Sequence, residues 1–466
     1  MTPHNDDTIA AIATPIGTGG LAIIRISGSK TLEIVDKIFK SKHDTDELKS
    51  WHIYLGNLFD KKDIIDEVTV SFYRSPRSYT TEDIVEIGCH GGIFVARRIL
   101  DVILENGARL AEPGEFTKRA FINGRIDLSQ AEAVADLIHS KTEISRNISL
   151  KHMEGQLYEK IERIRNELID ILSLLEIELD FSEEDIEFVE RENFIIKLNH
   201  TIEEIEHLIN SYSTGKIIKE GINLIIIGKR NVGKSSLLNA LLREDRAIVT
   251  EIPGTTRDVL EEQLDIKGIL FNVIDTAGIA ETDDPVEKEG IKRTHGKIER
   301  ANIVIHVLDF SNTLTKEDQS IISKVESLSN QKGLKIISVI NKIDLDKKIE
   351  IEKISYFENN IPIVRTSAKT FAGIDDLEDM LYQKAFEGEN KYNTSDVIIT
   401  KKRHVEALKK CSGSLKRALK TSQTGLSSEF ISVDLREALD SLGEIIGIVT
   451  NEDILKNIFE KFCIGK

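Results

Sequence analysis

The stretch Gly228-Lys229-Arg230-Asn231-Val232-Gly233-Lys234-Ser235 decides the fold of the middle of this chain. It fits the phosphate-loop pattern G-x-x-x-x-G-K-S/T and stands between the apolar run 224–227 and the run 236–242, which is typical of a helix start. A strand, a glycine loop and a helix in this order support such a motif. Backbone N–H groups and a helix N-terminus attract a phosphate. We therefore expect Lys234 to reach the β and γ phosphates of a nucleotide and Ser235 to bind Mg2+.

Taken alone, the loop could be a glycine turn that arose by chance, but four more motifs follow it in the chain. All except the first come directly after an apolar run typical of a buried strand. The motifs are Thr255-Thr256-Arg257-Asp258, Asp275-Thr276-Ala277-Gly278, Asn341-Lys342-Ile343-Asp344 and Ser367-Ala368-Lys369.

Asp344 indicates which base is bound. A carboxylate at this position can accept hydrogen bonds from both N1–H and the exocyclic amine of guanine, and adenine offers no such pair of donors. Asp275 would lie at a strand end beside Mg2+. Five motifs in this order, four of them directly at the carboxyl ends of expected strands, fit the ligand crevice of a doubly wound sheet. The sequence therefore predicts a guanine-nucleotide-binding domain.

Composition and charge limit the remaining possibilities. The 466 residues are enough for about three domains, and 79 acidic against 62 basic side chains give a formal net charge of −17. Such a chain is not a general polyanion binder, so a nucleic-acid contact must use a local basic patch, a partner's surface or shape. The three cysteines, Cys89, Cys411 and Cys463, lie far apart and suit a reducing cytosol.

The N-terminus carries acids where a signal peptide carries bases. No apolar run approaches the ~18 residues that a membrane-spanning helix needs. We therefore expect a soluble, cytoplasmic protein.

The chain divides into four segments. Residues 1–120 predict an α+β domain, residues 121–213 are helical, residues 216–380 hold the nucleotide motifs, and residues 381–466 are helical again. The fold class is therefore multidomain α+β and α/β, with a Ras-like P-loop domain, a doubly wound sheet, inserted into an all-α helical domain.

Periodicity places the elements within these segments. In the first helical segment, apolar side chains step by three and four from Leu157 to Leu179, which predicts a core-facing stripe. Cys411 lies on the apolar face of a later helix, so we expect it in the core. The expected strands cover 8–12, 21–26, 68–73 and 84–87, and the expected helices include 93–105, 435–442 and 453–462.

The end of the chain narrows the choice of family. The chain closes on Cys463-Ile464-Gly465-Lys466, a C-x-G-K terminus, and it also carries Pro113-Gly114-Glu115-Phe116, Asp127-Leu128-Ser129-Gln130-Ala131-Glu132-Ala133 and Gly254-Thr255-Thr256-Arg257-Asp258. With these motifs the chain closely resembles the MnmE (TrmE) family of tRNA-modifying GTPases. The resemblance covers essentially the whole length, in the family's domain order.

The resemblance implies an enzyme made of two proteins. A homodimer would join the flavoprotein MnmG (GidA), which supplies FAD, in a heterotetramer. This complex would add a carboxymethylaminomethyl (or aminomethyl) group to C5 of the wobble uridine, U34, of certain tRNAs. The N-terminal domain, residues 1–120, would dimerise and bind 5,10-methylenetetrahydrofolate (or 5-formyltetrahydrofolate), the one-carbon donor.

The resemblance also assigns residues to the folate and modification chemistry. By motif position, Arg25, Arg125 and Lys466 match basic folate contacts and Glu86 matches the acidic one. These residue types suit a folate, because its glutamate tail needs cations and its pterin needs a carboxylate; a surface salt bridge remains the alternative for each. Cys463 matches a cysteine implicated in the modification reaction, and a thiol on a flexible chain end is poor core material.

For GTP hydrolysis, the resemblance implies a mechanism without an arginine finger. Ile279 stands where Ras-type enzymes place a water-orienting glutamine, and Glu287 matches the glutamate that orients the attacking water in this family. K+ would take the place of a finger and activate hydrolysis by dimerising the GTPase domains. The expected ligands are Asn231, Thr250, Ile252 and Thr255 for K+, and Ser235 and Thr256 for Mg2+.

The expected GTP contacts follow the five motifs. They are Asn231, Val232, Gly233, Lys234, Ser235, Ser236, Thr250, Glu251, Ile252, Pro253, Gly254, Thr255, Thr256, Asp275, Thr276, Ala277, Gly278, Asn341, Lys342, Ile343, Asp344, Ser367, Ala368 and Lys369. A regulatory or ribosome-assembly switch GTPase without modification chemistry is the alternative. The C-x-G-K terminus and the folate-type N-terminal domain favour the enzyme, since a switch needs neither.

Overall fold

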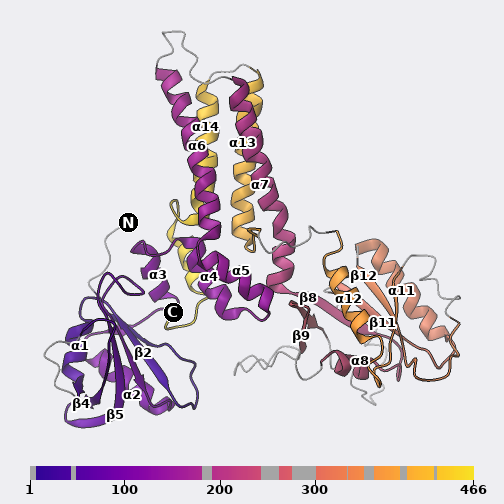
Figure 1. The fold of residues 1–466 in the computed structure, drawn as a ribbon, viewed down its shortest axis with the longest axis horizontal. Coiled ribbons are helices and arrows are strands. Elements are labelled where there is room, and N and C mark those ends of the chain that lie inside the picture. The colour runs from indigo at the N-terminus through magenta and orange to yellow at the C-terminus, as the bar shows by residue number, and fades with distance from the viewer. Residues whose placement is uncertain are drawn as a thin grey trace. The chain divides into compact units, whose positions relative to one another are not determined.

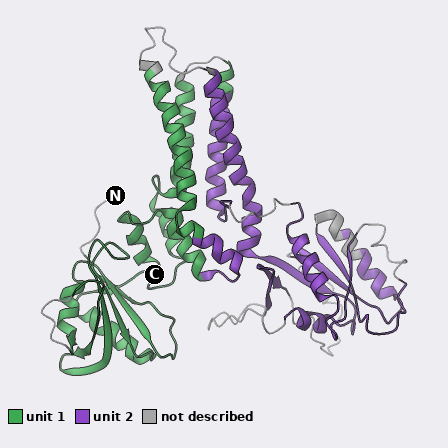
Figure 2. Ribbon diagram, in the orientation of Figure 1, with its two compact units in different colours: residues 1–138, 151–191, 420–466 green, residues 139–150, 192–419 purple. Residues whose placement is uncertain are grey.

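The computed structural model describes residues 7–42, 49–180, 191–242, 262–274, 301–332, 334–350, 361–388, 396–424 and 428–466. The chain forms two compact units (Figure 2). Unit 1 consists of residues 1–138, 151–191 and 420–466, and unit 2 of residues 139–150 and 192–419. In the ranges just given, each unit contains one β-sheet, and the long helices are divided between the units.

The N-terminal part of unit 1 is a seven-stranded sheet with two helices (Figure 1). Its strand order is β3-β4-β5-β6-β2-β1-β7, and every pair is antiparallel except β1 with β7. The elements are β1 (Ile9–Ile12), β2 (Ala22–Ser27), α1 (Thr31–Ile38), β3 (Phe39–Ser41), β4 (Ile53–Asp60), β5 (Asp63–Tyr73), β6 (Ile84–Cys89), α2 (Ile93–Glu105) and β7 (Arg109–Leu110).

Alternation along the strands explains this sheet. In β5, Val68, Val70 and Phe72 are buried and the residues between them are not, which is the period of two that a one-sided strand requires. They share one core with the apolar faces of α1 and α2. The four predicted strands and the helix 93–105 are confirmed, whereas α1, β3 and β4 were not predicted.

The helices of unit 1 follow the predicted periodicity. The stripe from Leu157 to Leu175 is buried along α6, which runs beside α14 (Figure 1). An ion pair of 2.6 Å joins Arg436 of α14 to Glu176 of α6. The helices are α3 (Glu115–Ile122), α4 (Leu128–His139), α6 (Gln156–Asp180), α14 (Ser428–Ile446) and α15 (Glu452–Phe459).

The last helix is shorter than the sequence predicts. Helix α15 ends at Phe459, and the chain turns there so that Phe462 packs beside Phe459 and Leu128 in a small core. The expected helix 453–462 therefore stops three residues early, because the turn buries an aromatic ring that a longer helix would carry away from α4. This turn also directs the C-terminus back toward the N-terminal domain.

In its described residues, unit 2 contains a six-stranded sheet with helices beside it, and most of three further helices whose ends belong to unit 1 (Figure 1). The strand order is β13-β12-β11-β8-β10-β9, parallel except for β9 with β10. The elements are α5 (Glu143–Met153), α7 (Arg191–Glu220), β8 (Ile222–Ile227), α8 (Lys234–Leu241), β9 (Glu262–Ile266), β10 (Ile269–Val273), β11 (Ile303–Asp309), α11 (Lys316–Lys332), β12 (Lys335–Asn341), β13 (Ile363–Arg365), α12 (Ile374–Ala385) and α13 (Lys402–Thr424).

Both faces of this sheet are covered. In β11, every residue is buried; Ile303 and Ile305 belong to the core on one face, and Val304 belongs to a second core on the other. Near-continuous apolar strands are the pattern of a parallel sheet between two helical layers. The strands predicted before the nucleotide motifs are confirmed as β8, β10, β12 and β13.

Helix α7 runs further than the sequence predicts. The helical segment was expected to end at residue 213, but α7 continues to Glu220. Gly221, with φ +81°, then ends the helix, and β8 begins at Ile222. Ile218 of this last turn is buried in the core of the sheet, which explains why the helix continues.

Buried Cys411 confirms the predicted core face of α13. Among the helices in the described ranges, none has the length and apolar character that crossing a membrane requires.

Candidate functional site

The phosphate loop joins β8 to α8 through residues with positive φ. Asn231 has φ +61° and Gly233 has φ +97°. A Cβ at Gly233 would stand 2.4 Å from Nδ2 of Asn341, so only glycine allows this close approach. Helix α8 begins at Lys234, and its first free N–H groups therefore face the loop.

The side chain of Lys234 folds back onto the phosphate loop. Its Nζ donates hydrogen bonds to the carbonyl oxygens of Gly228 at 3.1 Å and Lys229 at 2.9 Å. Ser235 and Ser236 are exposed at the start of α8, whereas Val232 is fully buried. The loop thus presents polar atoms to solvent and anchors itself through one apolar side chain.

Asn341, at the end of β12, ties three loops together. It is 1% exposed, and its Nδ2 donates to the carbonyl of Val232 at 3.1 Å. Its Oδ1 accepts hydrogen bonds from the N–H of Ala368 at 3.1 Å and from the hydroxyl of Thr366 at 3.4 Å. Because every polar atom of this buried amide has a partner, it fixes the distance between the phosphate loop and the loop after β13.

Asp344 and Ser367 meet at the expected base pocket. The Ser367 hydroxyl donates to Oδ1 of Asp344 at 2.7 Å, and this hydrogen bond lowers the pKa of Asp344 below its ordinary value. Asp344 is exposed, so its carboxylate is accessible from solvent. An ionised carboxylate held in this way is an acceptor for a base edge.

Lys342 connects the base loop to the phosphate loop a second time. Its Nζ donates to the Asn231 carbonyl at 2.6 Å and to Oδ2 of Asp309 at 2.7 Å. Asp309 is 4% exposed at the end of β11; burial alone would raise its pKa, but hydrogen bonds from Lys342, Ser311 and Asn312 lower the pKa of Asp309 to about 2. The carboxylate is therefore held ionised under the loop.

A second ion pair holds the other side of the phosphate loop. Nζ of Lys229 lies 2.8 Å from Oδ2 of Asp318, a residue of α11 that is 1% exposed. Thr315 donates to the same carboxylate from its N–H and its hydroxyl, at 2.8 and 2.7 Å. Burial tends to raise the pKa of Asp318, and the hydrogen bonds from Lys229 and Thr315 outweigh it and lower the pKa.

Other predicted site residues lie outside the described residues. They are Thr250, Glu251, Ile252, Pro253, Gly254, Thr255, Thr256, Asp275, Thr276, Ala277, Gly278 and Glu287. The structure thus brings together the phosphate loop and the two base motifs, Asn341–Asp344 and Ser367–Lys369.

The expected folate residues lie in unit 1, and two of them, Arg25 and Glu86, stand on neighbouring strands of its sheet. Arg25 of β2 stands directly opposite Glu86 of β6, and its Nη2 and Nε donate to Oε1 of Glu86 at 2.7 and 2.9 Å. The Arg25 guanidinium also lies 5.5 Å from the ring centroid of Tyr79. Arg125 lies over the same ring at 4.8 Å, and one of its amines donates to the Tyr79 carbonyl.

A cavity of about 480 Å³ opens beside this group. Its walls combine aromatic rings, a carboxylate and arginines, and they come from residues before, within and after the strand β6. They include Trp51, Tyr73, Tyr79, Glu86 and Arg125. Apolar walls with a few fixed polar groups are typical of a pocket for a planar organic ligand, and its volume is in the range of such pockets.

The chain end packs against the same domain. The carbonyl of Gly465 accepts a hydrogen bond from Nη1 of Arg25 at 3.4 Å, and the carbonyl of Cys463 accepts one from the N–H of Gly114 at 3.4 Å. Burial, with Arg25 nearby, lowers the pKa of the half-buried Lys466. The expected flexible end is therefore wrong, because the tail is anchored; the prediction that Cys463 is outside the core is confirmed by its exposure.

Two family models together match most of the chain. A family model described as "MnmE helical domain" matches residues 128–463, and a model described as "GTP-binding protein TrmE N-terminus" matches residues 8–125. The chain belongs to the MnmE family. This confirms the resemblance that the C-terminal motif and the three other family motifs indicated.

Curated relatives match this family member along nearly its full length. It is 45% identical over 465 residues to the tRNA modification GTPase MnmE of Alkaliphilus oremlandii, with 99% of each chain covered. It is 45% identical over 463 residues to the tRNA modification GTPase MnmE of Clostridioides difficile and 47% identical over 463 residues to that of Syntrophus aciditrophicus, again with 99% of each chain covered.

Sequence reasoning missed several residues of this MnmE chain that shape the two regions. Asp309 and Asp318 hold the lysines beside the phosphate loop, and Tyr79 stacks with two arginines. Asp309 could have been found from the sequence, because it ends a mostly apolar strand and the carboxyl ends of parallel strands meet at one edge. No local sequence pattern marks Asp318 or Tyr79, because only packing brings each of them to its partners.

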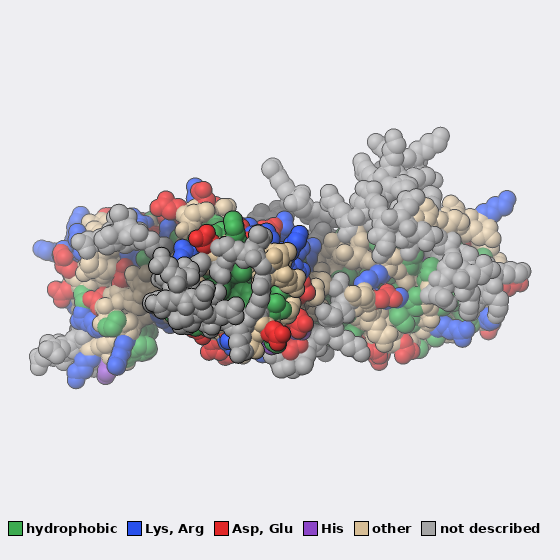
Figure 3. All heavy atoms as spheres, turned by 90° about the horizontal axis from the view of Figure 1, so that it is seen from above, with side chains coloured by type: hydrophobic (Ala, Val, Ile, Leu, Met, Phe, Trp, Pro, Cys, Tyr) green, Lys and Arg blue, Asp and Glu red, His purple; other side chains and the backbone are tan. Residues whose placement is uncertain are grey.

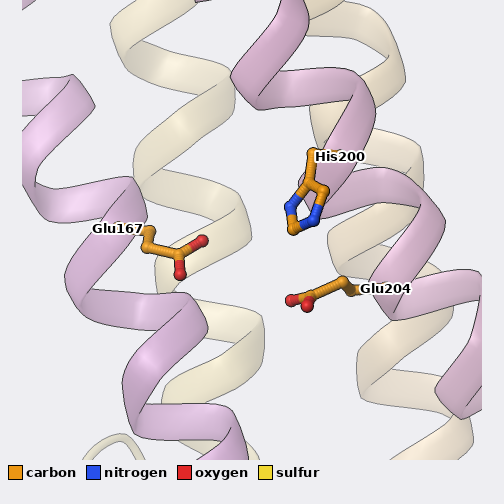
Figure 4. A group of neighbouring side chains, drawn as sticks. All are labelled: Glu167, His200 and Glu204. Atoms are coloured by element: carbon orange, nitrogen blue, oxygen red, sulfur yellow. The ribbon is translucent and has the colours of Figure 1, made fainter.

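Three side chains on the long helices also have the chemistry of metal ligands (Figure 4). His200 and Glu204 lie one turn apart on α7, and Glu167 lies on α6. Glu167 belongs to unit 1 and the other two to unit 2, so neither unit holds the three by itself. A histidine and a glutamate at this spacing on a solvated helix are ordinary surface groups, and we assign no metal site to them.

Proposed function

We propose that this protein is a cytoplasmic, GTP-hydrolysing tRNA-modification enzyme. As a homodimer joined to the flavoprotein MnmG (GidA) in a heterotetramer, it adds a carboxymethylaminomethyl (or aminomethyl) group to C5 of U34 in certain tRNAs, with FAD supplied by the partner. The proposal rests above all on one observation: the same chain holds a phosphate loop tied to a guanine-type base motif and, apart from it, a cavity of aromatic and charged groups.

The parts of the chain would divide this work. Residues 1–120 form the dimerisation and tetrahydrofolate-binding domain, and residues 216–380 form a Ras-like GTPase domain. This domain is inserted between the helical segments 121–213 and 381–466, the second of which carries the C-terminal C-x-G-K motif.

Guanine selection would depend on the ionised side chain of Asp344. Its carboxylate accepts from the N1–H and the amine of the base, while Ser367 holds the carboxylate in place at 2.7 Å. Asn341 keeps the phosphate loop and the base loop at a fixed separation, and Lys234 moves from the loop carbonyls onto the nucleotide's phosphates. A preformed frame of this kind reduces the ordering cost of binding.

The metal ions fit the donor chemistry of the same loop. Ser235, exposed at the start of α8, and Thr256 would hold Mg2+, which supplies charge stabilisation at the phosphates. Asn231, Thr250, Ile252 and Thr255 would hold K+; side-chain and carbonyl oxygens suit a large, weakly hydrated cation. Asn231 is exposed in the strained left-handed conformation that Lys342 stabilises through its carbonyl, and this leaves its side chain at the rim. Glu287 would orient the attacking water.

The cavity of unit 1 would hold 5,10-methylenetetrahydrofolate (or 5-formyltetrahydrofolate), which supplies the one-carbon unit. Glu86 offers the acceptor that a pterin edge needs, and Tyr79 and Trp51 offer flat apolar walls. Arg125 on the cavity wall, with Arg25 and Lys466 close to Glu86, offers positive charge for a glutamate tail. The anchored chain end places the exposed Cys463 beside this domain, where it would take part in the modification.

Potassium dependence tests the GTPase part of the proposal. GTP hydrolysis by the purified protein is measured in KCl and in NaCl at equal ionic strength. We expect a large rise specific to potassium that is lost in Asn231→Ala and in Glu287→Ala, and K+-dependent dimerisation of the GTPase domains in light scattering. Equal rates in both salts would show that hydrolysis does not use K+.

An assay of tRNA modification tests the second part of the proposal. It distinguishes a modification enzyme from a switch GTPase. Unmodified tRNA is incubated with the protein, MnmG, GTP and the folate, and its nucleosides are analysed by mass spectrometry. Deletion of the last four residues should leave hydrolysis intact and abolish the new nucleoside. A wild-type protein that hydrolyses GTP but never yields the nucleoside would favour a regulatory or ribosome-assembly GTPase.

A further inference from the structure

Helix α13 reverses the charge balance of the chain. Of its 23 residues seven are basic and one, Glu406, is acidic, whereas the whole chain carries 79 acidic and 62 basic side chains. On the surface seen from above, acidic and basic side chains are interspersed (Figure 3). A helix with so one-sided a charge therefore differs from the general surface of this protein.

Six of these basic side chains form one face of the helix, which we call the basic ridge. At 3.6 residues per turn they fall within an arc of about 120° and span about 27 Å along the axis. The opposite face, with Leu408, Cys411 and Leu415, is buried. The basic ridge consists of Lys402, Lys409, Lys410, Lys416, Arg417 and Lys420, all of them exposed.

Solvent-exposed acids pair with part of this charge. Lys416 lies 2.5 Å from Glu206 of α7 and Lys402 lies 3.5 Å from Glu406, and both are solvent-exposed pairs of the kind that contribute little. In the part of the chain that the structure describes, no acidic side chain lies within 4.0 Å of Lys409 or Lys420. The ridge therefore carries net positive charge.

We propose that the basic ridge of α13 is a docking surface for the sugar–phosphate backbone of tRNA. This inference rests on the proposed tRNA-modifying function. A chain of charge −17 repels RNA over most of its surface, so contact with RNA needs a local array of cations. Lysines act as point charges toward phosphate and read no base edge, so the ridge holds the tRNA body without choosing among tRNAs.

Binding of a tRNA transcript to the full-length protein tests the proposal. The transcript, with uridine at the wobble position, is titrated in fluorescence anisotropy between 50 and 300 mM KCl. The ridge variant combines Lys409→Gln, Lys416→Gln and Lys420→Gln, which lie on one line of the helix. The matched control combines Lys37→Gln, Lys62→Gln and Arg97→Gln, three exposed cations of the N-terminal domain, so both variants lose the same charge.

We expect the ridge variant to bind about tenfold or more weakly at 100 mM KCl. Its plot of log affinity against log salt should be shallower by about 2, since fewer counterions are released, and the control should behave as wild type. Circular dichroism and GTP hydrolysis should be unchanged in both variants. A structural defect alone would not lower the salt slope.

Three results would overturn the proposal. Equal affinity and slope in the ridge variant and the wild type would show that tRNA binds elsewhere, with the proposed function intact. Equal losses in the ridge variant and the control would show a general charge effect. Loss of sedimentation with phosphatidylglycerol vesicles, without loss of tRNA affinity, would assign the ridge to a lipid surface. Whether the protein modifies tRNA at all is tested separately, by the nucleoside analysis with MnmG.

Discussion

The nucleotide loops of unit 2 take their partners from the ends of neighbouring parallel strands, whereas the charged cavity of unit 1 collects side chains from several unrelated segments. Asn341 reaches Val232 because β12 and β8 end at the same edge of one sheet. Arg25, in contrast, contacts Glu86, Tyr79 and the carbonyl of Gly465, which belong to a strand, a loop and the chain end.

The comparison shows two ways to hold a charged group. Around the phosphate loop, lysines are paired with buried aspartates, so the positions of Lys229 and Lys342 are set by Asp318 and Asp309. In the cavity, aromatic rings share this work, and one ring, that of Tyr79, lies against two arginines. The nucleotide site, whose groups are held by paired charges, should lose most of its ligand affinity when one contact is removed. The cavity, whose groups are held by several rings and charges, should lose only the part of its ligand affinity that the removed contact contributes.

The strongest test of this difference is Asp344→Asn. We expect GTP affinity to fall about 100-fold or more, because the base would face an amide that offers a donor where two acceptors are needed. Xanthosine triphosphate, with a carbonyl in place of the guanine amine, should bind this variant better than GTP. Titration with fluorescent nucleotide analogues measures both. As a control, Ser367→Ala should reduce GTP affinity only a few-fold, and unchanged GTP binding by Asp344→Asn would show that the base lies elsewhere.

A single substitution in the cavity should reduce ligand affinity less than Asp344→Asn reduces GTP affinity. In Glu86→Gln the acceptor for a pterin becomes weaker and the partly buried Arg25 loses its ionic partner. We expect the affinity for 5-formyltetrahydrofolate to fall by about 2 kcal/mol, or roughly 30-fold, as measured by calorimetric titration. Glu33→Gln, which removes the exposed pair with Lys37, is the control and should bind the folate normally. Wild-type affinity in Glu86→Gln would place the ligand outside this cavity.

The aspartate under the phosphate loop should contribute to the stability of the fold, and its contribution should depend on pH. The pKa of Asp309 is about 2 in the folded protein against an ordinary 3.8, so its ionised form stabilises the fold. Asp309→Asn should therefore lower the unfolding free energy of unit 2 by about 2 kcal/mol at pH 7. Because the folded pKa is the lower one, this contribution is complete above the ordinary pKa and is lost as pH falls from about 4 to about 2.

Scanning calorimetry of wild type and Asp309→Asn at several pH values measures this difference. The gap in Tm should be constant at neutral pH and should narrow below pH 4. A gap that does not change with pH would mean that packing, and not the charge of Asp309, accounts for the loss.

The smallest effect is expected at the anchored chain end. Gly465 has φ +94°, and a Cβ there would stand 2.6 Å from the carbonyl oxygen of Ile12. Gly465→Ala should therefore weaken the docking of the tail by about 1 kcal/mol, and carboxypeptidase should release Lys466 several times faster. Gly388→Ala tests whether positive φ alone matters, since nothing lies within 4 Å of its added Cβ. Equal release from Gly465→Ala and wild type would show that the tail is not held by this contact.

Much of unit 2 could be predicted from the sequence, because its signals are local. A strand followed by a glycine loop and a helix was expected around Lys234, and the strand before Asn341 was expected from its apolar run; both are present. In unit 1 the alternating strands β2, β5 and β6 were predictable for the same reason. The strands β3 and β4 were not, since β4 exposes Ile53 and Leu55 and so lacks a clean alternation.

The sequence by itself determined the family, the phosphate loop and the order of the nucleotide motifs, because these depend on turn conformation and strand periodicity within a few residues. Only the tertiary structure decided which groups these residues meet. The hydrogen bond from Arg25 to Gly465 joins positions 440 residues apart, and Lys229 finds Asp318 across 89 residues. No local pattern encodes such pairs, since they form only when separate segments pack and bury the same charged groups.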